Sequence, residues 1–263
     1  MLPPRQSFVT ICGMEVNPHT LARNLEAVRS RIEAAASRGG RRAEDVTLVA
    51  ISKTFPAAAI RAAWDAGVRH FGENRVQEWE GKQPDVADLA ATWHLVGHLQ
   101  SNKARRAASL FHCIDSVDSL DIAGRLDAAL AESPRIAPVS PRTGSVSFPS
   151  GVFRLSILLE VRLAPEETKS GIDPSQLEVL ARAVRLMPRL ELAGLMCIPP
   201  PAEDPEHMRP YFRRLREMRD ALRTATGAGM PVLSMGMSHD FEVAIEEGAT
   251  EVRIGSAIFG ARA

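Results

Sequence analysis

The sequence predicts a single (β/α)8 barrel of the TIM type, on three observations. Short apolar, β-branched segments alternate eight times with longer amphipathic segments, the pattern of strands that are each followed by a helix. The chain has 263 residues, about the length of one such barrel. No glycine-rich dinucleotide turn follows the first predicted strand, which disfavours the alternative of a doubly wound open sheet.

The beginning of the chain predicts a flexible tail. Residues 1–16 contain two prolines and show little periodicity, so we expect the barrel itself to span residues 17–263. The sequence does not decide between Met1 and Met14 as the start of translation.

A long amphipathic helix is expected over residues 18–38 and ends at Gly39-Gly40. Its hydrophobic face is formed by residues spaced by four, three and four positions, namely Leu21, Leu25, Val28 and Ile32.

The strands of the barrel are expected wherever short runs rich in β-branched and aromatic residues stop at turn-forming residues. These runs are residues 46–53, 70–74, 92–98, 111–117, 155–161, 190–198, 232–235 and 251–255. The helices between them are expected over residues 56–67, 76–83, 101–110, 119–132, 174–186, 205–224 and 239–247, with a short helix at the end. Residues 133–151 are rich in Pro, Ser, Gly and Arg without any period, which predicts a surface loop.

Composition excludes several classes of function. Hydrophobic residues make up 45% and charged residues 24%, the profile of an ordinary soluble globule. The formal net charge is zero, so we expect no nucleic-acid or membrane partner. Neither a membrane span nor a signal peptide is visible. Cys12, Cys113 and Cys197 are far apart and form no C-x-x-C pair, so we expect no zinc knuckle, no disulfide framework and a cytoplasmic setting.

The first predicted strand ends in Lys53, at the position where barrels carry their active sites. Burial there disfavours the ammonium form, so we expect the amine to be a nucleophile toward carbonyl groups. Only four of the 32 basic residues are lysines, and arginine cannot form an imine. The alternative is a lysine that keeps its ammonium in solvent at a strand end.

The ends of the seventh and eighth strands look like a phosphate site. Small residues there, in the segments 234–238 and 253–256, let backbone N–H groups and hydroxyls approach an anion. Barrels often bind phosphate at these two positions. The alternative is a pair of ordinary turns with glycines and capping serines.

Three other polar residues are candidates for metal binding or acid–base chemistry. His94 and His98 have the i, i+4 spacing of a metal pair, but they flank a strand end and no acidic cluster accompanies them in sequence, so we expect no metal. Glu73 is a candidate acid or base, or the partner of a nearby arginine.

A reactive amine facing a phosphate site favours an aldehyde that carries a phosphate. Pyridoxal 5′-phosphate (PLP) satisfies both requirements. A phosphorylated sugar aldehyde, as in a lysine-dependent aldolase, satisfies them as well.

Seven motifs, which together cover about residues 14–262, resemble the pyridoxal phosphate homeostasis protein family, also called the YggS/PROSC family. They are AISKT at 50–54, FGENRVQE at 71–78, WHLVGHLQSNK at 93–103, KSGI at 169–172, GLM at 194–196, LSMGMS at 233–238 and VRIGSAIFG at 252–260.

The resemblance implies a barrel related to the N-terminal domain of alanine racemase, with PLP held as an aldimine on Lys53. It implies phosphate contacts from the small residues of the last two strand ends, namely Ser234, Gly236, Gly255 and Ser256. It also implies Asn74 beside the ring, Met196 near the face of the ring, and Arg253 at the pyridine nitrogen or the phosphate. A cation at that nitrogen weakens the ring as an electron sink.

The resemblance further implies a carrier that takes part in PLP homeostasis, with apo PLP-dependent enzymes as acceptors and no robust turnover. We expect a monomer. The alternative is a PLP-dependent racemase, which needs a second base, a tyrosine supplied by another domain. The chain has one tyrosine, Tyr211, and no sequence remaining for that domain. Lys103 and Lys169 are secondary candidates for transient imines during transfer.

Overall fold

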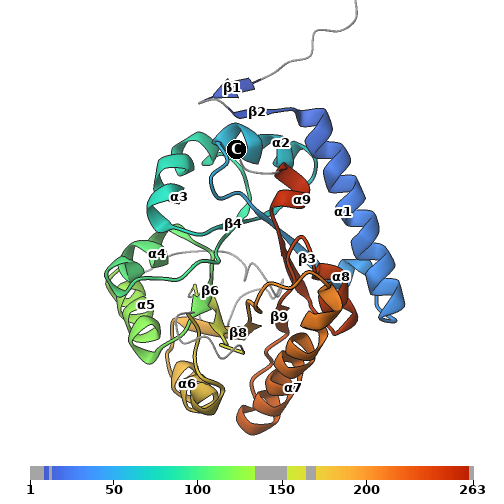
Figure 1. Cartoon of the computed structure of the whole chain (residues 1–263). Helices are drawn as coiled ribbons and strands as arrows, with labels where there is room; N and C mark the ends of the chain where they lie inside the picture. Colours follow the sequence, from blue (N-terminus) through green and yellow to red (C-terminus); the bar gives the residue numbers. More distant parts are fainter. Residues whose placement is uncertain (1–8, 12–13, 134–152, 164–169, 261–263) are drawn as a thin grey trace, which may run out of the picture.

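The computed structural model describes residues 9–11, 14–133, 153–163 and 170–260. Eight parallel strands close into a barrel with helices around it, which confirms the predicted fold class (Figure 1). The strands, in the order in which they pair around the barrel, are β10 (Glu251–Ile254), β3 (Thr47–Ile51), β4 (His70–Glu73), β5 (Thr92–Leu95), β6 (Cys113–Val117), β7 (Leu155–Glu160), β8 (Leu190–Met196) and β9 (Val232–Ser234).

The predicted helices are present as well, each within a few residues of its expected ends. They are α1 (Pro18–Arg38), α2 (Ala57–Asp65), α3 (Val76–Lys82), α4 (Ala104–Leu110), α5 (Leu120–Glu132), α6 (Leu177–Arg185), α7 (Arg209–Thr226), α8 (Phe241–Glu246) and α9 (Ser256–Phe259). Single 3-10 turns precede α4, α6 and α7, where the sequence pattern predicted continuous helices. The predicted loop 133–151 lies outside the described residues, apart from Ser133. No helix in the described part of the chain combines the length and hydrophobicity needed to cross a bilayer.

The first residues contain structure that the sequence analysis did not expect. β1 (Val9–Ile11) pairs antiparallel with β2 (Met14–Val16), with Val9 opposite Val16. Both segments contain β-branched residues, which favour strands, but three residues are too short for a period of two to be recognised. The sequence analysis therefore missed these two short strands, whereas the flexible tail over residues 1–16 and its division from the barrel stay predictions.

Helix α1 lies in the outer ring of helices, between α2 from the first half of the barrel and α8 and α9 from its end. It begins where Asn17 Oδ1 accepts hydrogen bonds from the backbone N–H of His19 and Thr20, and Gly39 caps its end. Its predicted apolar face is buried, and the helix packs against α2, α8 and α9 (Figure 1). Asn24 Nδ2 also donates to the carbonyl oxygen of Ile258, 3.1 Å away, which ties α1 to the last helix.

The barrel interior contains a buried charged cluster centred on His94. His94 Nδ1 lies 3.1 Å from Asp115 Oδ2 and 3.9 Å from Glu251 Oε2, and its Nε2 lies 3.1 Å from His70 Nδ1. Burial alone would lower the pKa of His94, but its interactions with Cys113 and Asp115 raise it to about 10. The raised pKa favours the charged form of this ring, which lies beside the carboxylates of Asp115 and Glu251. The expectation that no acidic group accompanies His94 was wrong, because β6 and β10 bring these acids from distant parts of the chain.

A second buried charged cluster joins β3, β4 and α3. Lys82 Nζ lies 2.9 Å from the Ser52 carbonyl oxygen, 3.0 Å from Glu73 Oε1 and 2.6 Å from Glu78 Oε1. Burial raises the pKa of Glu73, and the charge of Lys82 opposes that rise. Of the two alternatives for Glu73, the structure favours the ion-pair partner, although the cation is a lysine. Ser52, the residue before Lys53, also donates its hydroxyl to Glu73. The cluster is therefore joined to the segment that carries Lys53.

Replacement of Lys82 by methionine should lower the free energy of unfolding by about 3 kcal/mol, because it leaves the Glu73 carboxylate buried without its cation. Urea denaturation measures this loss. The double variant Lys82→Met/Glu73→Gln should recover part of it, since the uncompensated charge is then gone. A single variant as stable as the parent would show that the cluster contributes nothing.

Candidate functional site

A pocket of about 410 Å3 lies at the C-terminal ends of the barrel strands. Its lining includes five residues that the sequence analysis selected, which are Lys53, Asn74, Arg253, Gly255 and Ser256. Arg253 lies in β10, and the other four residues follow β3, β4 and β10, which are neighbours in the barrel. The predicted amine and one half of the predicted phosphate site therefore share a single cavity.

Arg253 is the fixed cation of this pocket. Its side chain comes from β10 and is 4% exposed. Nη1 donates to Ser234 Oγ at 2.7 Å, and Nη2 donates to the carbonyl oxygen of Cys197 at 2.9 Å. Burial raises the pKa of the Cys197 thiol to about 12, so this neighbour stays neutral. Two acceptors from β9 and from the end of β8 thus hold the guanidinium in place.

Three predicted site residues lie behind the pocket wall. Met196 packs with Leu158, Ala193 and Val232 in an apolar cluster of the barrel interior. Ser234 is fully buried and bonds to Arg253. Gly236 bends the loop after β9, and its carbonyl accepts from the Arg253 N–H. The structure therefore gives Ser234 the position of a residue that orients Arg253.

The loop after β9 needs its glycine. Gly236 has φ of +93°, and a Cβ there would lie 2.6 Å from Ala244 Cβ and 2.8 Å from Phe241 Cα. The turn brings Ser238 to the pocket, where its hydroxyl accepts from the Ala257 N–H at 3.3 Å. The loops after the seventh and eighth barrel strands are thereby joined at the place where the sequence predicted a phosphate site.

Glu160 lines the same pocket and was missed by the sequence analysis. It is the last residue of β7 and is 3% exposed. Oε1 accepts from Ser170 Oγ at 2.9 Å, while Oε2 is buried and has no hydrogen-bond partner among the residues that the structure describes. Burial raises the pKa of this carboxyl, an effect that Ser170 and Arg253 oppose. Its position at a strand end, equivalent to that of Lys53, is the signal that could have revealed it.

Of the remaining candidates, only His98 lines the pocket among the described residues. His98 lines the pocket at 54% exposure, and its Nδ1 is 3.3 Å from Asp118 Oδ2, so it does not join the His94 cluster. Lys103 lines a neighbouring hollow. Tyr211 lies in α7 and packs against the outer hydrophobic core. Lys169 is outside the described residues.

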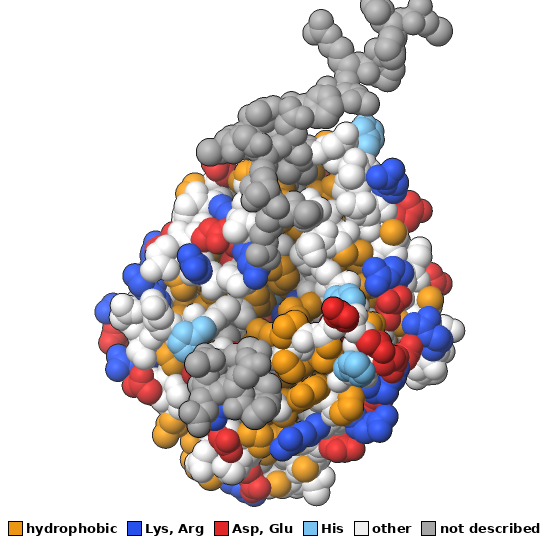
Figure 2. Space-filling view, in the orientation of Figure 1, with side chains coloured by type: hydrophobic (Ala, Val, Ile, Leu, Met, Phe, Trp, Pro, Cys, Tyr) orange, Lys and Arg blue, Asp and Glu red, His pale blue; other side chains and the backbone are white. Residues whose placement is uncertain are grey.

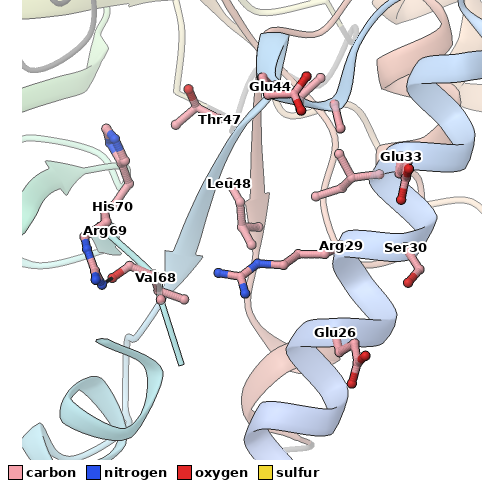
Figure 3. Close-up of a pocket in the computed structure, with 14 residues that line it drawn as sticks. Glu26, Arg29, Ser30, Glu33, Glu44, Thr47, Leu48, Val68, Arg69 and His70 are labelled. Carbon is pink, nitrogen blue, oxygen red and sulfur yellow. Dashed lines mark hydrogen bonds between the residues drawn. The ribbon is translucent and has the colours of Figure 1, made fainter. Parts of the chain in front are cut away.

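A larger hollow, of about 650 Å3, lies where β3 and β4 begin, against α1 (Figure 3). Arg29 reaches into it from α1, and Arg69 and His70 face it from the start of β4. Both arginines already donate to backbone carbonyls. Barrel active sites lie at the other ends of the strands, so this hollow is not the candidate site.

The surface beside the candidate site is partly apolar. Ile198 and Met237 line the pocket and are 41% and 36% exposed. Figure 2 shows hydrophobic side chains gathered near the middle of the face that it draws. Apolar contact surface is therefore available at the pocket entrance.

Comparison with known proteins places the chain in a family. The model of the alanine racemase N-terminal domain matches residues 19–263. The pyridoxal phosphate homeostasis protein of Pseudomonas aeruginosa is 45% identical over 243 residues, 92% of this chain and 96% of the relative. That of Escherichia coli K12 is 44% identical over 248 residues, 92% and 97% of the two chains.

Solved structures agree with this result. PipY of Synechococcus elongatus, solved with PLP bound, has a TM-score of 0.76 at 37% identity and covers 91% of this chain and 100% of its own. Alanine racemase of Clostridium difficile has a TM-score of 0.68 at 14% identity, covering 93% of this chain and 60% of the racemase, and this likeness shows the fold alone.

Glu160 predicts a pH dependence of stability. Its pKa is raised in the folded state, so folding takes up a proton, and stability falls as pH rises from about 4.5 through the raised pKa. Glu160→Gln should remove this dependence while keeping a partner for Ser170. The variant should match the parent at pH 4.5 and exceed it by about 1–2 kcal/mol at pH 7.5 in urea denaturation.

Exposed Glu217 provides the matched control, because Glu217→Gln should shift stability little at either pH. An equal difference between Glu160→Gln and the parent at both pH values would contradict the assignment of Glu160.

Proposed function

The chain belongs to the pyridoxal phosphate homeostasis protein family, and on this premise we propose that it binds PLP reversibly in the pocket at the C-terminal strand ends and takes part in PLP homeostasis. The observation that carries the proposal is the meeting of Lys53 with Arg253, Gly255 and Ser256 in one cavity of about 410 Å3. The cavity therefore offers an amine for an aldehyde and donors for a phosphate.

The residues of the pocket fit the parts of PLP. When bound, PLP supplies an aldehyde that condenses with a lysine amine. Lys53 is the described lysine that lines the pocket. Gly255, Ser256 and Ser238 offer backbone N–H groups and hydroxyls to the phosphate. Asn74 lies on the wall beside Lys53, and Met196 belongs to the apolar cluster behind the wall.

Arg253 supports a carrier over a catalyst. Its guanidinium is held by Ser234 and by the Cys197 carbonyl, so it presents a permanent positive charge to the pocket. A cation at the pyridine nitrogen keeps that nitrogen unprotonated and the ring a weak electron sink. The only tyrosine of the chain, Tyr211, is in α7 and not on the pocket wall.

We further propose that the protein is a monomeric carrier in the cytoplasm and that it delivers PLP to apo enzymes.

Lys53 is tested by covalent capture. Protein incubated with one equivalent of PLP should absorb as an imine, and borohydride should fix the cofactor on the Lys53 peptide in mass spectrometry. Lys53→Ala and Lys53→Arg should both lose the absorbance and the label. The control Lys103→Arg should keep both. A label that persists in Lys53→Arg on another lysine would reject the assignment.

The carrier function is tested by racemisation of amino acids. PLP-loaded protein at high concentration should show turnover far below about 1 s−1, the lower end of ordinary enzymes. Any residual rate should be unchanged in Tyr211→Phe, because this ring lies outside the pocket. A turnover number in the normal enzymatic range would favour the racemase alternative.

A further inference from the structure

Two sequence motifs are only partly used by the cofactor pocket. Residues 74–77 follow β4, and residues 97–103 follow β5. Both segments line a second hollow of about 670 Å3. The residues of these two motifs that do not line the cofactor pocket are therefore gathered around another hollow.

The two hollows are neighbours that share a wall. Asn74, Gly97 and His98 line both of them. In this wall Gly97 packs directly on Asn74: a Cβ at Gly97 would overlap the Asn74 carbonyl oxygen and lie 2.9 Å from Asn74 Cα. A ligand in either hollow would therefore lie next to the same three residues.

The second hollow is lined for an anion. Arg75 and Lys103 contribute two cationic side chains, and Gln77 and Gln100 contribute amides. The described residues that line it include no carboxylate. Arginine and lysine are the usual phosphate ligands, one as a planar fork and the other as a point charge.

Two carboxylates that interact with residues of this lining also have other partners or lie outside it. Glu78, which interacts with Arg75 through charge, accepts from Lys82 Nζ at 2.6 Å and from the Thr54 N–H. Asp118 pairs with His98. Glu78 therefore divides its charge between Lys82 and Arg75, and the described lining of the hollow stays cationic.

We propose that this hollow binds a second PLP molecule by its phosphate, beside the loaded cofactor pocket, and is where PLP resides on its way to or from Lys53. This inference rests on the proposed function. The hollow has a volume of about 670 Å3, against about 410 Å3 for the cofactor pocket, and both lie within the range of small-molecule sites. The recognised group is a phosphate monoester on a small aromatic aldehyde.

The test begins with protein whose first site is filled permanently. Borohydride fixes PLP on Lys53, peptide mapping verifies this, and equilibrium dialysis then measures binding of further PLP. We expect one additional equivalent, displaced by inorganic phosphate and not reproduced by pyridoxal, which lacks the phosphate. Absence of label on Lys53 in the first step would reject the proposed function. Normal label with no further equivalent would reject this inference alone.

Matched variants locate the additional equivalent. Arg75→Gln and Lys103→Gln should each weaken its Kd about tenfold, whereas Lys103→Arg should retain affinity because the charge remains. The control Arg105→Gln removes an exposed cation that lies outside this hollow, and it should change nothing. A second equivalent with the same Kd in all four variants would place it elsewhere and overturn the assignment.

Discussion

The pairing of β10 with β3 is the constraint on which the site depends. These strands come from opposite ends of the chain, and their parallel register sets Arg253 beside Val49 and Ile254 beside Ala50. The pairing closes the barrel and brings Lys53, just beyond one strand, next to Gly255 and Ser256, just beyond the other. A lysine near the start of the barrel and a loop of small residues near its end thus become parts of one pocket.

Closure also creates a low-dielectric interior, and most of the buried charge there is balanced. His94 has Asp115 and Glu251, and Lys82 has Glu73 and Glu78. Glu160 is different, because one of its oxygens has no hydrogen-bond partner within the described part of the chain. Buried polar groups normally find partners, so an exception within a cofactor pocket indicates an atom kept available for a ligand or a proton. The charge clusters support the barrel, whereas Glu160 belongs to the site.

The sequence could predict what depends on local pattern. The α1 helix had both its hydrophobic spacing and its glycine end in one segment, so its bounds were predicted correctly. The positions of Lys53 and Arg253 at strand ends could be predicted from the alternation of strands and helices. The partners of His94 could not be predicted, since β5, β6 and β10 meet only when the barrel closes. The position of Ser234 behind Arg253 depends in the same way on side-chain directions in neighbouring strands.

The order of strands around the barrel also fits a carrier. β3 lies between β10 and β4, so Lys53 stands between the loops proposed to bind the phosphate and the wall formed by Asn74 and Gly97. An enzyme gains rate by excluding water and fixing its cofactor between acid and base groups. Here the pocket that contains the amine shares Asn74, Gly97 and His98 with a second, cationic hollow. A binding site that must release its ligand intact needs such an adjacent polar route, because a phosphate dianion crosses a cationic surface at lower cost than an apolar one.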